Sequence, residues 1–407
     1  MKRIAAAFLT ILCQQVYAEP LVWIDQGLEA YANQSYKHAY DAFYQAAQAG
    51  HSEAQCLVGL MQIAGQGTTP QTRQGLAWLK KAEAAKNPCA SRLQAQLYLG
   101  GVVVPFNEKK AIAYIQQAVD FGYFRAPLDL ISFYNANDDV EKAVAVREKL
   151  IKDLIASPYH QDPDIQFLIG ALYYELNQIE LSFQWHLKAA LQHNPKSQTH
   201  VGLSYFQQAQ PELALEWIKK AAEQKDAQAQ YILGRMYMST PTIDYGQAQY
   251  WLLQAIDQQH AEAMLTLGDL LIKIVNPPPL EAVEYYLQAI EHKSIDAYLR
   301  IADLYATGHI LPQNDLFAYI FYKHIYVLLL TPQEYIVEDQ EKSFLYAVNQ
   351  TNALEKTLLA RDPIYSPDID YSQPVKDVRA QIKTPQTLRQ FVLNTLKQAS
   401  PVSNEKP

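Results

Sequence analysis

The sequence has little glycine, no excess of positive charge and no long apolar run. It contains 15 Gly among 407 residues, so packed helices rather than strands and tight turns are expected to build the core. Its formal net charge of -8 argues against nucleic acid or an anionic membrane surface as the main partner. No stretch reaches the roughly 18 apolar residues that a membrane-spanning helix needs, so no transmembrane segment is expected in the mature chain.

Motifs for chemistry are also missing. The ten His residues show no metal-ligand spacing, and no glycine-rich phosphate loop, nucleophile elbow or Cys/His pair stands out. Four of the His residues recur at turns between predicted helices, where a solvated repeat feature explains them better than a metal site: His51, His193, His260 and His292. We therefore expect no enzymatic activity, cofactor or metal, although an active site built from scattered residues would leave no motif.

Residues 1–18 have the three parts of a secretory signal peptide. Lys2 and Arg3 form a positive start, residues 4–12 are apolar, and Ala18 is the small residue that signal peptidase requires. We therefore predict cleavage after Ala18 and a periplasmic or secreted mature protein. An anchored or cytoplasmic N-terminus is the alternative.

Two small residues recur along the chain at intervals of 32 to 39 residues. Residues 212–240 provide the template, a helix pair whose first helix carries Ala221 and whose second carries Gly234. Positions equivalent to Ala221 are Ala46, Ala82, Ala118, Leu150, Ala189, Ala255, Ala289 and Lys323. Positions equivalent to Gly234 are Gly59, Ala95, Ile131, Gly170, Gly202, Gly268 and Ala302.

These two series predict stacked helix pairs. Small residues allow helices to cross closely, and a Trp or Tyr four residues before each Ala is expected to fill the space between successive pairs. Ile131 departs from the pattern, so the third pair should pack more loosely or at a different angle. So short a pair cannot bury its apolar face alone and needs neighbours on both sides.

Residues 52–85 and 214–237 resemble the Sel-one-like repeat (SLR), a relative of the tetratricopeptide repeat. The shared signature is Trp-Leu/Ile-x-Lys-Ala in one helix and Ala-Gln-x-x-Leu/Val-Gly in the other. The resemblance extends over about residues 36–325 and is weak between 121 and 165. It implies an all-α, right-handed α-solenoid with a role in protein–protein interaction, and no conserved catalytic chemistry.

On this basis the chain divides into six segments. They are a signal peptide (1–18), an SLR/TPR-like α-solenoid of about eight pairs (19–330), a capping helix (331–360), a linker (361–383), an amphipathic helix (384–399) and a disordered tail (400–407). A first helix over residues 21–35 is expected to cover the open end of the stack, with Trp23 facing inward. The amphipathic helix could dock on the solenoid or engage a partner.

The three Cys residues do not form an obvious framework. Cys13 follows Leu12, which is larger than the residue that lipoprotein processing needs, so lipidation is disfavoured. Cys56 and Cys89 would remain after cleavage, and a disulfide is conceivable in an oxidising compartment. Because they occupy different helical positions in adjacent pairs, we favour two unpaired thiols. Some SLR proteins carry paired cysteines in every repeat, a pattern that is absent here.

The second helix of each pair is expected to line the concave side of the stack. Residues one and four after the small marker then face the groove. The main candidates are Tyr174, Phe206, Arg235, Met238, Asp269 and Asp303. A strip of this composition suits a peptide or a protein helix. Each aromatic residue could instead pack against the neighbouring pair, and stacked Tyr residues could bind a glycan.

Three functions follow from these observations. The first is an exported adaptor that holds envelope proteins together through the groove. The second is an accessory protein of polysaccharide or peptidoglycan assembly. The third, a β-lactamase-like hydrolase as proposed for some cysteine-rich SLR proteins, is the weakest because their cysteine pattern is missing.

Overall fold

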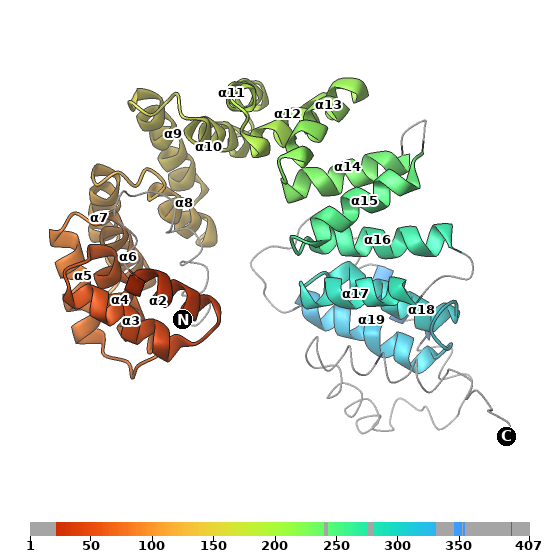
Figure 1. Ribbon diagram of the computed structural model, residues 1–407, viewed down its shortest axis with the longest axis horizontal. Coiled ribbons are helices and arrows are strands. Elements are labelled where there is room, and N and C mark those ends of the chain that lie inside the picture. The colour runs from red at the N-terminus through yellow and green to blue at the C-terminus, as the bar shows by residue number, and fades with distance from the viewer. Residues whose placement is uncertain are drawn as a thin grey trace. The chain divides into compact units, whose positions relative to one another are not determined.

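The computed structural model describes residues 22–239, 243–275, 280–330, 346–351, 353–354 and 392. These residues form helices joined by turns and loops, which confirms the predicted all-α class of successive helix pairs. The chain divides into two compact units, Met1–His160 and Gln161–Pro407, called the N-terminal and C-terminal units below. Within each unit, neighbouring helices follow one another in chain order (Figure 1). None of the described helices has both the length and the apolar character needed to cross a bilayer.

The N-terminal unit contains α2 to α9. Their bounds are α2 (Val22–Ala32), α3 (Tyr36–Gln48), α4 (Ser52–Ala64), α5 (Thr72–Ala84), α6 (Pro88–Gly100), α7 (Glu108–Asp120), α8 (Pro127–Ala136) and α9 (Val140–Ala156). The predicted first helix is present as α2, but the expectation that Trp23 faces inward is wrong, because 40% of it is exposed. Ile24 and Leu28 of α2 pack on the core instead.

The C-terminal unit contains α10 to α19. Their bounds are α10 (Pro163–Glu175), α11 (Ile179–Leu191), α12 (Pro195–Gln207), α13 (Pro211–Glu223), α14 (Ala227–Ser239), α15 (Tyr245–Ile256), α16 (Ala261–Ile274), α17 (Glu281–Glu291), α18 (Ile295–Thr307) and α19 (Asp315–Leu330). The predicted fourth pair, residues 140–177, therefore spans the division, because α9 belongs to one unit and α10 to the other.

Parts of the predicted C-terminal helices also belong to the C-terminal unit. Residues 346–351 and 353–354, within the predicted capping helix, are helical. Ala347 of this segment and Val392 of the predicted amphipathic helix are both fully buried in one core cluster with α17, α18 and α19. The rest of these two helices, the signal peptide, the linker and the tail lie outside the described residues, and their boundaries stay predictions.

The glycines of the second series lie at the junctions between helix pairs. A Cβ atom added to Gly234 would lie 3.2 Å from the carbonyl oxygen of Ala248 in the next pair, and one added to Gly268 would lie 3.1 Å from that of Ala282. A larger side chain would therefore push the backbones apart. Every position named in the first series, apart from Lys323, is buried.

A third row of small residues was missed from the sequence. At Gly59, Gly202, Gly234 and Gly268, an added Cβ atom would meet the carbonyl oxygen of a member of this row in the next pair. Its members stand seven residues, or two helical turns, before the Ala of the first series. They are Ala39, Gly75, Ala111, Ala143, Ser182, Ala214, Ala248, Ala282 and Ala318, all of them buried. This row also corrects the first series at its last member. Ile325, seven residues after Ala318, is fully buried, whereas the predicted Lys323 is half-buried.

The side chain that fills the space between pairs is the residue after the Trp, and not the Trp itself. This position is buried in every pair: Phe43, Leu79, Ile115, Arg147, His186, Ile218, Leu252, Tyr286 and Tyr322. Trp78, Trp185 and Trp217 are only half-buried, and the Lys three residues after each one covers its ring. Lys81 lies 4.1 Å from the ring centroid of Trp78, and Lys220 lies 4.6 Å from that of Trp217. The signature therefore combines a buried core residue with a cation–π pair at the surface.

In three pairs the Gln of the signature, at Gln55, Gln198 and Gln230, closes the turn between the two helices. Gln198 donates its side-chain N–H to the carbonyl oxygen of Ala190 at 3.2 Å, and Gln230 does the same to Ala222. Gln224 then donates to Gln198 Oε1 at 2.7 Å, which links one pair to the next. Because a buried polar group without a partner is costly, these bonds favour the observed register of the stack.

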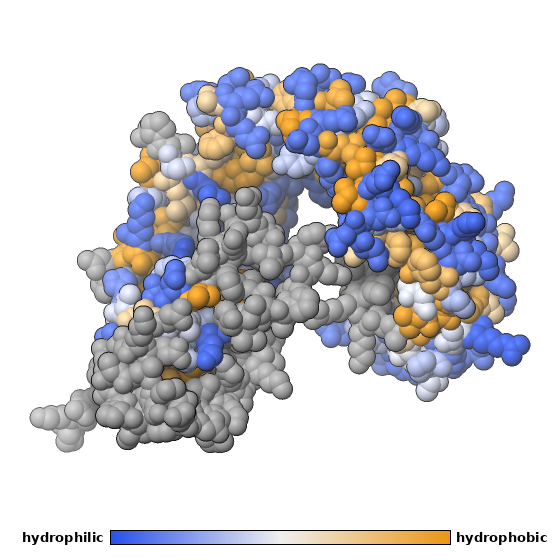
Figure 2. All heavy atoms as spheres, turned by 180° about the vertical axis from the view of Figure 1, so that it is seen from behind, coloured by the Kyte–Doolittle hydropathy of each residue, from blue (hydrophilic) through white to orange (hydrophobic). Residues whose placement is uncertain are grey.

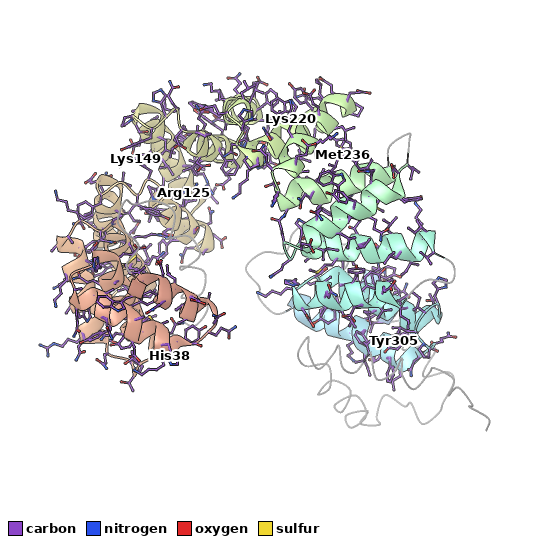
Figure 3. All side chains as sticks on the ribbon, viewed as in Figure 1. His38, Arg125, Lys149, Lys220, Met236 and Tyr305 are labelled. Atoms are coloured by element: carbon purple, nitrogen blue, oxygen red, sulfur yellow. A yellow bond between two sulfur atoms is a disulfide. The ribbon has the colours of Figure 1, made fainter. Side chains whose placement is uncertain are left out.

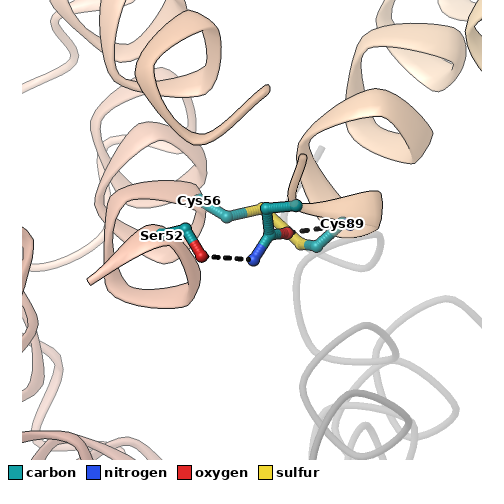
Figure 4. Close-up of a disulfide and its surroundings, with 4 residues drawn as sticks. Ser52, Cys56 and Cys89 are labelled. Atoms are coloured by element: carbon teal, nitrogen blue, oxygen red, sulfur yellow. Dashed lines mark hydrogen bonds between the residues drawn. A yellow bond between two sulfur atoms is a disulfide. The ribbon is translucent and has the colours of Figure 1, made fainter. Parts of the chain in front are cut away.

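The prediction that Cys56 and Cys89 are unpaired is wrong, because the structure joins them by a disulfide (Figure 4). Their Cα atoms are 6.5 Å apart, within the range that a disulfide spans. The second helices of adjacent pairs, α4 and α6, are staggered, so different helical positions become neighbours. The same stagger brings the Nδ2 atom of Asn87, at the start of α6, to 3.2 Å from Ser52 Oγ.

Ile131 is buried, although it is larger than its counterparts in the other pairs. Its helix, α8, packs mainly on α9 and touches α7 only slightly. The looser packing predicted for this pair is therefore observed between α7 and α8.

Candidate functional site: an apolar hollow in the C-terminal unit

Helices α12, α13, α14 and α16 enclose a surface hollow of about 430 Å³ in the C-terminal unit. Its lining is mostly aliphatic, aromatic and thioether side chains. The residues are Gly202, Leu203, Phe206, Ala214, Ile218, Ile232, Arg235, Met236, Met238, Ser239 and Thr266. Met236 on α14 and Lys220 on the neighbouring helix α13 are labelled in Figure 3. Three of the six predicted groove residues, Phe206, Arg235 and Met238, line this hollow.

The hollow lies at a junction of the repeat. Gly202 and Ala214 belong to the small-residue rows, so the backbones of α12 and α13 approach closely there. Ile218, fully buried, packs over Gly202. Phe206 stands one helical turn further along α12 with 60% of it exposed. An aromatic ring with this exposure beside an apolar hollow is typical of a binding surface.

Sequence reasoning missed the α14 residues that complete the lining. Ile232, Met236 and Ser239 share one face of α14 with Arg235, because they stand at three- and four-residue spacings. The prediction had considered only the residues one and four positions after Gly234, which form a narrower strip of the helix. The same helical periodicity, applied to the whole of residues 227–239, would have found this face.

Arg235 is held in place by an aromatic stack. Its guanidinium carbon lies 5.6 Å from the ring centroid of Tyr231, and its Nη1 atom donates a hydrogen bond of 3.3 Å to the Tyr231 hydroxyl. The Tyr231 ring in turn stacks on His260, with ring centroids 4.8 Å apart. Burial lowers the pKa of His260, although Glu262 and Asp226 partly oppose this effect. The neutral imidazole therefore adds no repulsive charge beneath Arg235.

Asp269 and Asp303 do not line the hollow, and both accept hydrogen bonds from residues of the following helices. Asp269 accepts two hydrogen bonds from Arg300, at 2.8 and 3.0 Å, and one from the Tyr286 hydroxyl at 2.7 Å. Asp303 accepts hydrogen bonds from the hydroxyls of Tyr322 and Tyr346.

These hydrogen bonds reduce the negative charge that the two carboxylates present. Burial, reinforced by the Asp carboxylates, raises the pKa of both Tyr286 and Tyr322, so each remains a hydrogen-bond donor. Arg300, a residue that sequence reasoning did not consider, neutralises Asp269. The sixth candidate, Tyr174 on α10, is 58% exposed and also lies outside the hollow lining.

A second cluster of polar groups lies inside the C-terminal unit, at α10, α11 and α12. The rings of His186 and His200 stack nearly parallel, with centroids 4.4 Å apart, and Phe167 lies against both. His186 is 3% exposed, and its Nδ1 atom is 3.4 Å from Ser197 Oγ. Its Nε2 atom has no hydrogen-bond partner among the described residues. Burial first, and the neighbouring His200 second, lower the pKa of His186 to about 3.

The predicted turn positions of four His residues agree with the structure. His51 and His260 precede α4 and α16, His292 follows α17, and His193 adopts a positive φ of 64° between α11 and α12. In the described part of the chain, no group of three or more His, Cys, Asp or Glu residues is arranged to hold a metal ion.

The N-terminal unit has a hollow of different composition. It has a volume of about 590 Å³ and is lined by Trp23, Asp41, Tyr44, Gln45, Gln48 and Ala49. Two aromatic rings beside a carboxylate and two amides form a wetter surface than the hollow of the C-terminal unit. In the space-filling view, apolar residues lie exposed among hydrophilic ones in both units (Figure 2).

A family model described as Sel1 repeat matches the sequence seven times and covers just over half of the chain. The matched residues are 52–87, 95–122, 166–194, 196–226, 227–260, 276–294 and 295–323. The first match spans α4 and α5, the second helix of one pair and the first of the next, which are joined by the small-residue junction. No match falls on residues 123–165, where the spacing is irregular and the two units divide.

Solved structures with similar folds have low sequence identity to this chain. A protective antigen of uropathogenic Escherichia coli that displays an SLR fold is 18% identical, with 95% of this chain and 87% of that chain covered and a TM-score of 0.44. A Sel1 repeat protein from Oxalobacter formigenes is 22% identical, with coverages of 58% and 99% and a TM-score of 0.38. The immunity protein PA5088 from Pseudomonas aeruginosa is 18% identical, with coverages of 60% and 84% and a TM-score of 0.31. No curated protein matches the sequence.

Proposed function

Because the chain belongs to the Sel1 repeat family, we propose that it is a non-enzymatic scaffold that binds another protein through the hollow of its C-terminal unit. The observation that supports this most is the exposed Phe206 beside an apolar hollow of about 430 Å³. Binding sites for apolar side chains combine such a concave surface with a few polar groups that set orientation. Arg235, Ser239 and Thr266 are the polar groups here.

We further propose that the scaffold acts in the periplasm or outside the cell, with envelope proteins as partners. The predicted signal peptide of residues 1–18 is the first support. The Cys56–Cys89 disulfide is the second, because structural disulfides persist in oxidising compartments and are rare in the cytosol. Cell fractionation and the N-terminal sequence of the purified protein test this proposal. A mature protein that begins at Glu19 is expected, and an intact Met1 in the cytosolic fraction would contradict it.

Site-specific photocrosslinking in the source cells tests the scaffold proposal. A benzophenone amino acid replaces Phe206 at the hollow or, as a matched control, Lys219, an exposed residue of the neighbouring helix α13. We expect a discrete protein adduct from position 206 and none from position 219. Thr266→Trp, which fills the hollow from α16, should abolish the adduct. The proposal fails if position 206 gives no adduct, or if both positions give the same one.

A second candidate function is glycan binding in cell-envelope polysaccharide or peptidoglycan assembly. The hollow of the N-terminal unit favours it, because the rings of Trp23 and Tyr44 can stack on a sugar while Asp41, Gln45 and Gln48 offer hydrogen bonds. Co-sedimentation of the protein with purified sacculi should then fall in Trp23→Ala and stay unchanged in Phe206→Ala. Equal binding by wild type and Trp23→Ala would remove this candidate.

A further inference from the structure

We propose that the hollow of the C-terminal unit recognises an acidic amphipathic peptide segment: one bulky apolar side chain enters the hollow, and a carboxylate close to it in the peptide pairs with Arg235. This inference rests on the proposed scaffold function and names the chemistry of the partner.

The size and lining of the hollow select an apolar group. A volume of about 430 Å³ lies within the roughly 300–1,000 Å³ typical of ligand sites. Ile218, Ile232 and Met236 supply aliphatic and thioether surface, and a sugar or phosphate would lose hydrogen bonds to water there without replacing them. Met236 and Met238 are unbranched and can adapt to Leu, Ile, Met or Phe of a partner.

The charge of the hollow selects an anion beside that apolar group. Arg235 is the one charged residue among the lining residues, and in the described part of the chain it takes part in no ion pair. The Tyr231 hydroxyl accepts a hydrogen bond from one of the five N–H groups of Arg235, and the Tyr231 ring packs against the guanidinium group. A guanidinium held in this way is suited to pair with a carboxylate through two parallel hydrogen bonds.

The carboxylates at the matching positions of the next two pairs are already engaged and so do not compete for Arg235. Asp269 is already paired with Arg300, and Asp303 is held by two Tyr hydroxyls. The carboxylate that completes the site therefore comes from the partner, either as an Asp or Glu side chain or as the carboxyl terminus of the segment.

An anionic membrane would also offer apolar chains and negative charge, but the observations favour a peptide. A membrane surface attracts clusters of basic residues, because a single one contributes little binding energy. This hollow has a single Arg, and the chain carries a net charge of -8. Binding to lipid is therefore an outcome that would overturn the proposal.

The test starts from selection of peptides on the full chain. Random 12-residue peptides displayed on phage are selected against the wild-type protein and, in parallel, against Arg235→Gln, whose folding is checked by circular dichroism. Because Arg235 is exposed, the variant should fold. Wild-type selections should enrich Leu, Ile, Met or Phe within four residues of Asp or Glu, and Arg235→Gln selections should lose the acid and keep the apolar residue.

Fluorescence anisotropy with the best selected peptide gives the quantitative answer. The acid of the peptide is removed by a Glu→Gln change or, where the selected acid is the carboxyl terminus, by amidation. Either change should weaken binding to the wild-type protein about tenfold and leave binding to Arg235→Gln unchanged. The two peptide changes distinguish a side-chain carboxylate from a terminal one. Arg235→Glu should in turn bind a Glu→Lys peptide more tightly than the original peptide.

Three results would overturn the proposal. The first is that the selected peptides show no enrichment of Asp or Glu. The second is that wild type and Arg235→Gln bind the selected peptide with equal affinity. The third is that wild type, but not Arg235→Gln, binds vesicles of phosphatidylcholine and phosphatidylglycerol (3:1). If crosslinking from position 206 succeeds while these tests fail, the scaffold function stands and only the chemistry assigned to the partner is wrong.

Discussion

His186 should make the C-terminal unit sensitive to acid. It occupies a buried position between helix pairs that Leu79 and Leu252 occupy elsewhere in the repeat, and it stacks on His200. Burial and the neighbouring His200 lower its pKa from the usual 6.5 of histidine to about 3 in the folded chain. The folded state therefore keeps His186 neutral at pH values where the unfolded chain already takes up a proton.

The sign and size of the effect follow from this difference in proton uptake. Above pH 6.5 neither state binds the proton, and His186 does not affect the free energy of unfolding. As the pH falls from 6.5 towards 3, the unfolded state gains protons and stability is lost, by about 2 kcal/mol at pH 5 from this residue alone. The pKa of His200 is also lowered by burial, with partial opposition from Asp226, so it adds to the loss.

His186→Leu tests this reasoning, because it installs the residue of the equivalent positions and removes the unpaired Nε2 atom. The free energy of unfolding is measured with urea by circular dichroism at pH 7.5, 6 and 5. From pH 7.5 to pH 5 it should fall by about 2 kcal/mol less in the variant than in wild type. Replacement of the exposed His292 by Gln is the control and should leave the pH dependence unchanged. If His186→Leu loses stability towards pH 5 as steeply as wild type, the assignment of acid sensitivity to the stacked pair is refuted.

Three further predictions concern the stack itself. Replacing Cys56 and Cys89 by Ser opens a loop with a sequence separation of 33 and should lower the free energy of unfolding of the N-terminal unit by about 3 to 4 kcal/mol; wild type in reductant should match the variant. Gly59→Ala should destabilise by about 1–3 kcal/mol, because the new Cβ would lie 2.9 Å from the Gly75 carbonyl oxygen. Gly100→Ala, where nothing lies within 4 Å, should be neutral or slightly stabilising, and equal thermal shifts for the two Gly variants would contradict the junction model. Ala209→Gly should raise the free energy of unfolding by about 1 kcal/mol, because Ala209 follows α12 with a positive φ of 57° that glycine adopts without strain. In the same urea unfolding experiment, Ala221→Gly in the middle of α13 should lower it by at least about 1 kcal/mol.

Periodicity was enough to predict the helix pairs and the two rows of Ala and Gly on them, but not the third row that Gly234 and Gly268 meet in the next pair. It was not enough to identify which side chain fills the space between pairs. Trp217 and Ile218 are neighbours in sequence, and both are apolar, so spacing alone could not decide which one faces the next pair. The Lys that follows Trp217 by three residues is the overlooked signal, because a charged group above the ring marks the Trp as lying at the surface.

The disulfide and the hollow needed information that one helix period does not contain. Cys56 and Cys89 become neighbours through the stagger between α4 and α6, a property of how two helices pack. The hollow draws on α12, α13, α14 and α16, and its shape depends on the small side chains of Gly202 and Ala214 at the junction. The ion pair between Asp269 and Arg300 links two different helix pairs. The prediction of groove residues considered each pair separately and so could not find it.

The junction between helix pairs carries a consequence for the length of the chain. At Gly234 and Ala248, as at Gly268 and Ala282, a side chain and a carbonyl oxygen of the next pair lie so close to the glycine that a Cβ atom would not fit without a shift. Because Gly59 and Gly202 make a similar contact, duplication or deletion of one whole period between such steps would rebuild a compatible joint. Some helix pairs are joined by a contact that the other pairs lack, such as the Cys56–Cys89 disulfide or the Asp269–Arg300 ion pair. Duplication or deletion of one of these pairs would remove that contact or leave it without a partner.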